Sequence, residues 1–166
     1  MKMKTLHDLL VDELKDLHSA EMQLTKALPK MAKAAQSPEL KQAFLTHREQ
    51  TQGQIERLQQ AFEALGKRAK GVTCEAINGL IEECEELLEE AKEPSPVRDA
   101  GLVACAQAVE HYEIARYGSL VAWTKAKGQT DVAALLQQTL DQEKNTDTLL
   151  SKLGNADLNQ QAAKAA

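Results

Sequence analysis

Apolar residues recur along most of this chain at intervals of three and four positions, which is the spacing of one face of an α-helix. Leu, Ala, Glu, Lys and Gln, all strong helix formers, fill the segments between them. Gly and Pro fall at a few discrete places, and no run of alternating β-branched residues competes with the helical pattern. The chain is therefore predicted to be all-α.

End signals in the first half of the chain predict two long helices. Thr5 can cap the first helix, with Asp8 three residues further on as in a capping box. Ser37 followed by Pro38 has the order of an N-cap and a first helical residue, so a second helix is predicted to begin there. Gly66 is expected to end this second helix.

The second half of the chain contains a shorter helix and two further long ones. The shorter helix is predicted at about residues 74–92, and the proline-rich break at residues 94–96 follows it. A third long helix starts at that break and ends at Gly128, and Thr130 can cap the fourth. The C-terminal tail, residues 155–166, carries no apolar stripe and is expected to fray.

The links between these helices indicate how they would be arranged. Short links join the first long helix to the second and the third to the fourth, which makes two antiparallel hairpins. The long connection through residues 67–95, with the shorter helix inside it, can carry the chain from one hairpin to the other. This connectivity is that of a ferritin-like four-helix bundle, which residues 1–154 would form as one domain, with the tail 155–166 outside it.

Composition and charge exclude several kinds of partner. Acidic residues outnumber basic ones 25 to 20 and aromatic residues make up 3% of the chain, so neither the basic surface nor the stacking rings of a nucleic-acid-binding protein are present. The longest uncharged stretches, such as residues 100–109, are far shorter than the roughly 20 apolar residues of a membrane span. The N-terminus lacks the apolar core of a signal peptide, and Cys74, Cys84 and Cys105 are odd in number without a CxxC pair. We expect a cytoplasmic protein with free thiols and with no nucleic-acid or membrane partner.

Polar residues interrupt the apolar stripes near the middle of each long helix. Side chains three and four positions apart share a helix face, so a polar residue between apolar ones on that face points inward with them. Glu21 lies between Leu17 and Leu24 in this way, and His47 interrupts the second helix similarly. The inward-facing candidate metal ligands are Glu21, His47, Glu110, Glu113, Glu143 and Asp147, with Gln54 and Tyr117 beside them.

Five carboxylates that face one core need positive charge nearby. Each buried unpaired charge costs several kcal/mol even after relaxation, and the core stripes hold no Lys or Arg. His47 alone offsets one charge at most, whereas two divalent cations supply four. Oxygen ligands with one imidazole favour iron or manganese over zinc or copper(I). We therefore predict a site for two iron ions, with manganese as the second choice, and expect Gln54 and Tyr117 to donate hydrogen bonds to the ligating carboxylates.

Each of these residues also has a purely structural interpretation. A single Glu in an apolar stripe can lie at the edge of the core with its carboxylate in water, although five such residues at one level fit this poorly. A lone His in a helix stripe can be a hydrogen-bonded core residue, so His47 need not be a ligand. Tyr117 can serve in packing alone.

Several of these segments also resemble the YciF-like family of bacterial stress proteins, which belongs to the ferritin-like superfamily. The likeness covers roughly residues 3–155 and lies in the segments Asp16–Glu21, His47–Glu56, Val109–Ala115 and Glu143–Asp147, of which Val109–Ala115 is the most specific. The resemblance implies a ferritin-like fold, a homodimer, a role under stress and a dinuclear iron-binding centre. It implies no established enzymatic activity.

The chain departs from the wider ferritin-like pattern at its ligand positions. In that pattern two helices each carry Glu-x-x-His, and that motif is missing here: Glu110, for example, is followed at the same spacing by Glu113. Glu113 can replace the histidine as a carboxylate ligand. Glu49 points roughly 200° away from His47 around its helix, so both cannot face the bundle centre. His47 is the predicted ligand, and a contribution from Glu49 stays open.

Two functions are compatible with these residues. The first is a metal-binding stress protein that sequesters iron; if it is an enzyme, weak ferroxidase or peroxide-consuming activity would make it a di-iron carboxylate oxidoreductase. The second is a non-catalytic helical structural or interaction protein, in which carboxyl groups of raised pKa form a hydrogen-bonded network without metal. Uptake of iron or manganese by the purified protein separates the two.

Overall fold

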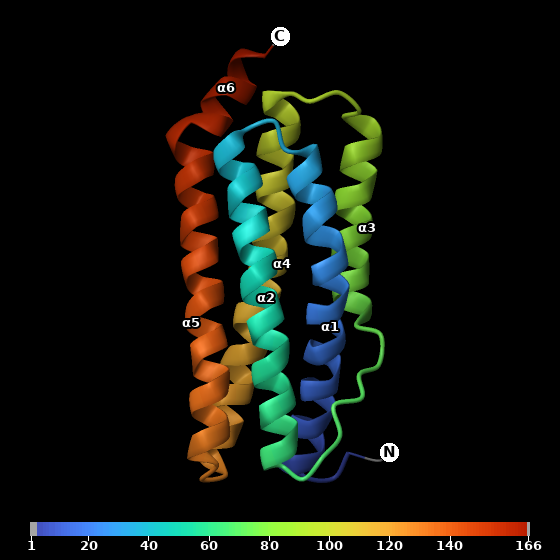
Figure 1. The fold of residues 1–166 in the computed structure, drawn as a ribbon, viewed down its shortest axis with the longest axis vertical. Helices are drawn as coiled ribbons and strands as arrows, with labels where there is room; N and C mark the ends of the chain where they lie inside the picture. The colour runs from blue at the N-terminus through green and yellow to red at the C-terminus, as the bar shows by residue number, and fades with distance from the viewer. Residues whose placement is uncertain (1–2, 166) are drawn as a thin grey trace.

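The computed structural model describes residues 3–165, and helices make up most of them (Figure 1). The four long helices are α1 (Leu6–Ala34), α2 (Pro38–Ala64), α4 (Pro96–Ala126) and α5 (Thr130–Leu153). The shorter α3 (Glu75–Glu90) lies in the connection between α2 and α4, and a π-helical turn, η1 (Gly154–Leu158), leads from α5 into α6 (Asn159–Lys164). The predicted all-α fold is confirmed.

The four long helices lie side by side as two antiparallel hairpins, α1 with α2 and α4 with α5 (Figure 1). Helix α2 packs on α5 and α1 packs on α4, so the two hairpins close into a bundle around one apolar core. Helix α3 lies outside the four and packs against α4 and α1. The predicted connectivity, with a long connection between two hairpins, is therefore confirmed.

The helices begin and end largely where local chemistry directs them. The hydroxyl of Thr5 accepts from the backbone N–H of Asp8 at 3.1 Å, and the Asp8 carboxylate accepts from the N–H of Thr5 at 3.0 Å, which completes the predicted capping box. Ser37 caps α2 as predicted. Gly66 and Gly128 follow α2 and α4 with φ of 65° and 70°. This left-handed conformation ends a helix without steric strain at glycine, which has no Cβ atom.

Two predictions about helix ends differ from the structure. Thr130 is the first residue of α5 rather than its cap: Gln129 takes the cap position, where its carbonyl accepts from the N–H of Ala133 at 3.0 Å and its side chain makes no capping hydrogen bond. The tail 155–166, expected to fray, continues as η1 and α6, with Ala166 outside the described residues. Its one large apolar side chain, Leu158, is buried, and α6 packs on α4.

No helix in the described part of the chain combines the length and the apolar character needed to cross a membrane. The long helices are amphipathic, and their apolar faces turn inward. This arrangement leaves the middle of the bundle as the place where inward-facing polar residues must meet.

Two charged residues in the first turn of α4 hold the connections at one end of the bundle together. Asp99 is 2% exposed and accepts from the backbone N–H groups of Gln36 and Ser37, at 2.8 and 2.7 Å. Arg98 is 7% exposed and donates to the carbonyl of Lys92 at 2.8 Å. The sequence did not predict this buried arginine, and its contacts tie the α1–α2 link to the α3–α4 link.

We expect Asp99→Ala to lower the free energy of unfolding by about 2–4 kcal/mol, because two N–H groups lose a charged acceptor that is buried. Denaturant unfolding monitored by circular dichroism measures this. Asp131→Ala is the matched control, since Asp131 is an exposed acidic residue in the first turn of α5 and should change the value by less than about 1 kcal/mol. Equal losses of unfolding free energy in the two variants would show that Asp99 stabilises the protein only through its charge at a helix N-terminus.

Candidate metal centre

Each of the four long helices brings a polar side chain to the interior of the bundle. Helix positions on the inward face are fixed by the apolar residues one turn away, so the polar side chains have no route to the surface. The carboxylates are completely buried, at 0% exposure, and the imidazole is 3% exposed. These side chains are Glu21 from α1, His47 from α2, Glu110 and Glu113 from α4, and Glu143 from α5.

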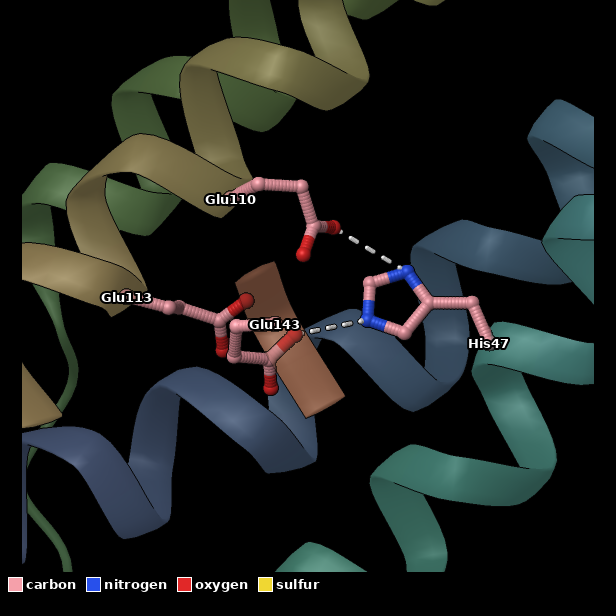
Figure 2. A group of neighbouring side chains, drawn as sticks. All are labelled: His47, Glu110, Glu113 and Glu143. Carbon is pink, nitrogen blue, oxygen red and sulfur yellow. Dashed lines mark ion pairs between the residues drawn. The ribbon is translucent and has the colours of Figure 1, made fainter. Parts of the chain in front are cut away.

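Four of these residues form a compact group that Figure 2 shows in detail. His47, Glu110, Glu113 and Glu143 each offer one nitrogen or oxygen atom, and these atoms all lie within 4.8 Å of one another. The Nδ1 atom of His47 lies 3.2 Å from Oε1 of Glu110, and its Nε2 atom lies 3.4 Å from Oε2 of Glu143. The imidazole thus lies between carboxylates from two different helices.

Glu21 is the fifth buried residue and is held by a tyrosine. The hydroxyl of Tyr117 donates to Oε1 of Glu21 at 2.5 Å, and both side chains are fully buried. Burial raises the pKa of Tyr117, and the charges of Glu21 and Glu113 raise it further, so this hydroxyl keeps its proton and remains a donor. Tyr117 thus donates to a buried carboxylate, and whether Glu21 is a metal ligand stays a prediction.

Most polar atoms of this cluster lack a hydrogen-bond partner among the described residues. Buried donors and acceptors are almost always paired in folded proteins, so a concentration of unpaired ones calls for an explanation such as an ion or water. The contacts of His47 with Glu110 and Glu143 are close, but neither has hydrogen-bond geometry. The unpaired atoms are Oε2 of Glu21, Nε2 of His47, and both carboxylate oxygens of Glu110, Glu113 and Glu143.

Burial and mutual repulsion raise the pKa values of three of the carboxyl groups. Burial is the largest cause for Glu21, and the charge of Glu143 adds to it. The same two causes raise the pKa of Glu110. For Glu113, burial is followed by the charge of Glu21. Without a cation these groups favour the protonated form, whereas a bound cation would favour the ionised one.

Asp147, which the sequence grouped with the ligands, lies at the edge of this cluster and outside the four-residue group. Its carboxylate is 21% exposed and accepts from the side-chain amide of Gln107 at 3.0 Å. Its Oδ1 atom also lies 3.2 Å from Nε2 of His111, which is an exposed side chain. Asp147 lies one turn beyond Glu143 on α5. At that position the helix face reaches the boundary between the core and solvent.

Gln54 is buried as predicted but makes a different contact. Its amide donates to the side chain of Gln142 at 3.4 Å rather than to a ligating carboxylate, and its Oε1 atom has no partner among the described residues. Glu49, whose contribution was left open, is exposed on α2 and lies outside the group. The predicted choice of His47 over Glu49 agrees with this placement.

Arg57 is a residue near the site that the sequence reasoning missed. It is partly buried between α2 and α5, where its guanidinium donates to the hydroxyl of Thr139 at 2.9 Å and to the side chain of Gln142. Its positive charge lowers the pKa of Glu21, although burial and Glu143 outweigh it. The spacing held a signal, since position 57 lies one turn after Gln54 and shares its side of the helix.

The donor set fits a hard or borderline cation. Three carboxylates and one imidazole converge, a fifth carboxylate adjoins them, and the unpaired oxygen atoms are the ligands that iron and manganese accept. Arg57 is the basic side chain whose charge acts on the cluster, and it neutralises one carboxylate at most. The arrangement can therefore hold cationic charge in a water-poor interior.

Comparison with known proteins identifies relatives over the whole chain. The family model "Domain of unknown function (DUF892)" matches residues 5–163. Protein YciF of Escherichia coli (strain K12) is 46% identical over 167 residues, which covers 100% of both chains. A family match of this extent and a relative of this identity together establish the family.

Solved structures agree with this relationship. The E. coli stress protein YciF matches with a TM-score of 0.90 and 45% identity, covering 95% of this chain and 99% of that one. YcfI from Rhodopseudomonas palustris, described as a proposed structural protein, matches with a TM-score of 0.87 and 48% identity, covering 90% and 95%. A protein from Xanthomonas campestris pv. campestris, at 24% identity and a TM-score of 0.72, shares the fold. The chain therefore belongs to the DUF892 family and is a relative of E. coli YciF, as the resemblance in its sequence implied.

Proposed function

We propose that this protein is a stress-related, ferritin-like protein that binds two iron ions, or manganese in their place, in the middle of its bundle. The observation that carries the proposal is the group of buried carboxylate oxygens that have no hydrogen-bond partner within residues 3–165. Four carboxyl groups and one imidazole would hold the ions. The stress-related role rests on the relative from E. coli, which is named a stress protein.

Ligands for the metal ions would come from all four long helices. Glu110, Glu113 and Glu143 would supply oxygen ligands and His47 a nitrogen ligand. Glu21 would be oriented by the hydroxyl of Tyr117, which fixes one of its oxygens and leaves the other free. Bound iron would supply the ferrous and ferric couple on which sequestration by oxidation or weak peroxide consumption depends. The surrounding leucine side chains would keep water out.

A second function is favoured by a specific observation and by a relative. The pKa values of Glu21, Glu110 and Glu113 are raised by burial, so these groups could remain protonated and form a polar network without metal. The relative from R. palustris is described as a proposed structural protein. In that case the chain would be a non-catalytic structural or interaction protein that keeps the ferritin-like scaffold.

Metal analysis of protein purified without chelators decides between the two functions. Inductively coupled plasma mass spectrometry should find about two iron or manganese ions per chain after anaerobic loading and desalting. The loaded protein should also unfold at a higher temperature, because a ligand that binds only the folded state stabilises it. If the protein retains no metal after loading and its melting temperature is unchanged, the metal-binding function is refuted and the structural function is favoured.

Asp147→Asn should leave the metal content unchanged at about two ions per chain, because Asp147 is partly exposed and already bonded to Gln107. The sequence placed this residue among the ligands, so the variant tests whether it belongs to them. The measurement is metal content after loading, followed by competition with a chelator. A drop to about one ion per chain would restore Asp147 as a ligand.

The homodimer implied by the resemblance stays a prediction. A shallow, mostly apolar groove between the start of α2 and the end of α5 is the kind of surface that a second copy could cover, and Leu149 there is 42% exposed. Size-exclusion chromatography with light scattering should give twice the mass of the 18.2 kDa chain. Leu149→Lys should shift the mass toward that of the monomer, and a monomeric wild type would refute the prediction.

A further inference from the structure

The crossover helix α3 packs on α4, and the register of this contact brings two of the cysteines to the same level. The two helices are antiparallel neighbours joined by a short link (Figure 1). Near one end of the contact, the Sγ atom of Cys74 lies 3.4 Å from the hydroxyl of Tyr112. Near the other end, a Cβ atom added at Gly101 would come within 2.7 Å of a methyl carbon of Leu87. Between these two contacts the register places Cys84 of α3 opposite Cys105 of α4.

The surroundings of the two thiols agree with this register. Cys84 and Cys105 line the same small apolar cavity, together with Leu80, Ile81 and Val109. A disulfide needs Cα atoms about 4.4–6.8 Å apart, so α3 and α4 must pack closely at the level of the two cysteines. Gly101, one turn before Cys105, has no side chain, and the Leu87 side chain of α3 packs directly against it. Neither cysteine is in a disulfide in the described part of the chain.

The two thiols differ in exposure and in acidity. Cys84 is buried at 5% exposure, whereas Cys105 is partly exposed. The interaction of the two neighbouring thiols, with burial second, raises the pKa of Cys84, and the same interaction lowers the pKa of Cys105. Thiolates react with peroxides and thiols do not, so the more exposed and more acidic Cys105 is the nucleophile of the pair.

We propose that Cys84 and Cys105 form a reversible disulfide between α3 and α4 when the protein meets hydrogen peroxide. The inference is independent of the metal centre. It gives the crossover helix a second, covalently fixed state.

The reaction balances with one peroxide for each pair. The Cys105 thiolate attacks one peroxide oxygen, an S–O bond forms, the O–O bond breaks, and the leaving hydroxide takes up a proton to become water. The Cys84 sulfur then attacks the Sγ atom of Cys105, an S–S bond forms, the S–O bond breaks, and the second oxygen leaves as water with the Cys84 proton. Two thiols are oxidised by two electrons, and a dithiol reductant reverses the change.

The disulfide would fasten a helix that packs less deeply than the four long ones. Only Ile77 and Cys84 of α3 are buried, and α3 lies outside the four long helices. A cross-link from residue 84 to residue 105 would close the α3–α4 connection in the unfolded chain as well. On loop length alone the oxidised protein should melt on the order of 5–10 °C higher than the reduced protein.

Peptide mapping of the full-length protein tests the proposal. The reduced protein is treated with hydrogen peroxide, unfolded in an alkylating reagent, digested without reductant and analysed by mass spectrometry. We expect a peptide pair cross-linked through Cys84 and Cys105, with Cys74 alkylated as the internal control. Three alkylated cysteines, a pair that includes Cys74, or a cross-link between two chains would each overturn the proposal.

Single substitutions assign the roles of the two cysteines. In Cys84→Ser, Cys105 should accumulate as sulfenic acid and be trapped by dimedone, because no second thiol resolves it. In Cys105→Ser, Cys84 should stay reduced, and Cys74→Ser should form the disulfide as the wild type does. Circular dichroism confirms that each variant is folded. Dimedone labelling at Cys84 of the Cys105→Ser protein would contradict the assigned roles.

Discussion

Glu113→Gln should abolish iron binding and, in the metal-free state, give a protein more stable than the wild type. Glu113 is fully buried, and neither of its carboxylate oxygens has a hydrogen-bond partner in the part of the chain that the structure describes. Burial and the charge of Glu21 raise its pKa. Glutamine keeps the length of the side chain and removes its charge, so the metal-free variant should gain about 1–3 kcal/mol in the free energy of unfolding. The same change removes an anionic ligand from the centre of the proposed site.

The measurement pairs metal content with denaturant unfolding, each with and without iron. Wild type should be stabilised by iron and Glu113→Gln should not, so the order of their stabilities should reverse on loading. Glu49→Gln is the matched control, because Glu49 is an exposed glutamate on α2 and should change stability by less than about 0.5 kcal/mol. If Glu113→Gln retained the wild-type metal content, Glu113 would not be a ligand.

The stability of the metal-free protein should fall as the pH rises from about 5 to about 8. The carboxyl groups of Glu21, Glu110 and Glu113 have pKa values raised above their ordinary value of 4.5, chiefly by burial. Above that value the unfolded chain releases these protons while the folded protein still holds them. Raising the pH therefore draws the equilibrium toward the unfolded state, and the loss continues up to the raised pKa values.

The stabilisation of the protein by bound metal should increase as the pH rises, opposite to the trend of the metal-free protein. Carboxylate ligands must be ionised to hold a cation, so the increase in melting temperature caused by iron or manganese should be small near pH 5 and large near pH 8. Differential scanning calorimetry at several pH values, with and without metal, measures both trends. Glu113→Gln should flatten the metal-free trend because one of the titrating groups is gone. Metal-free stability that rises through this pH range would contradict the assignment of raised pKa values.

The architecture was largely predictable because it depends on local and periodic features. The apolar spacing, the capping box at Thr5 and Asp8, the Ser37–Pro38 start and the two helix-ending glycines each act within a few residues. The tail was misjudged because Leu158 alone supplies its apolar contact, and one residue makes no stripe. What holds α6 in place is its packing on α4, which lies far away in the sequence.

The membership of the candidate site was predictable only in part. The periodicity identified four buried carboxylates and His47, because a helix face is set by spacing alone. It could not tell Glu143 from Asp147, one turn further along the same face, since both lie in the stripe and only the distance to the surface separates them. Arg57 escaped notice because a long side chain can reach inward from a position beside the stripe.

By itself the sequence determined that this chain forms long amphipathic helices, where most of them begin and end, and which polar residues face inward, because each depends on residues within a turn or two. Only the tertiary structure decided which of those residues meet within 4.8 Å and that Asp147 stays at the solvent boundary. It also brought Cys84 and Cys105 to the same cavity, since the register of α3 against α4 depends on contacts such as that of the Leu87 side chain with Gly101. Such distances follow from the packing of whole helices against one another, which no local pattern encodes.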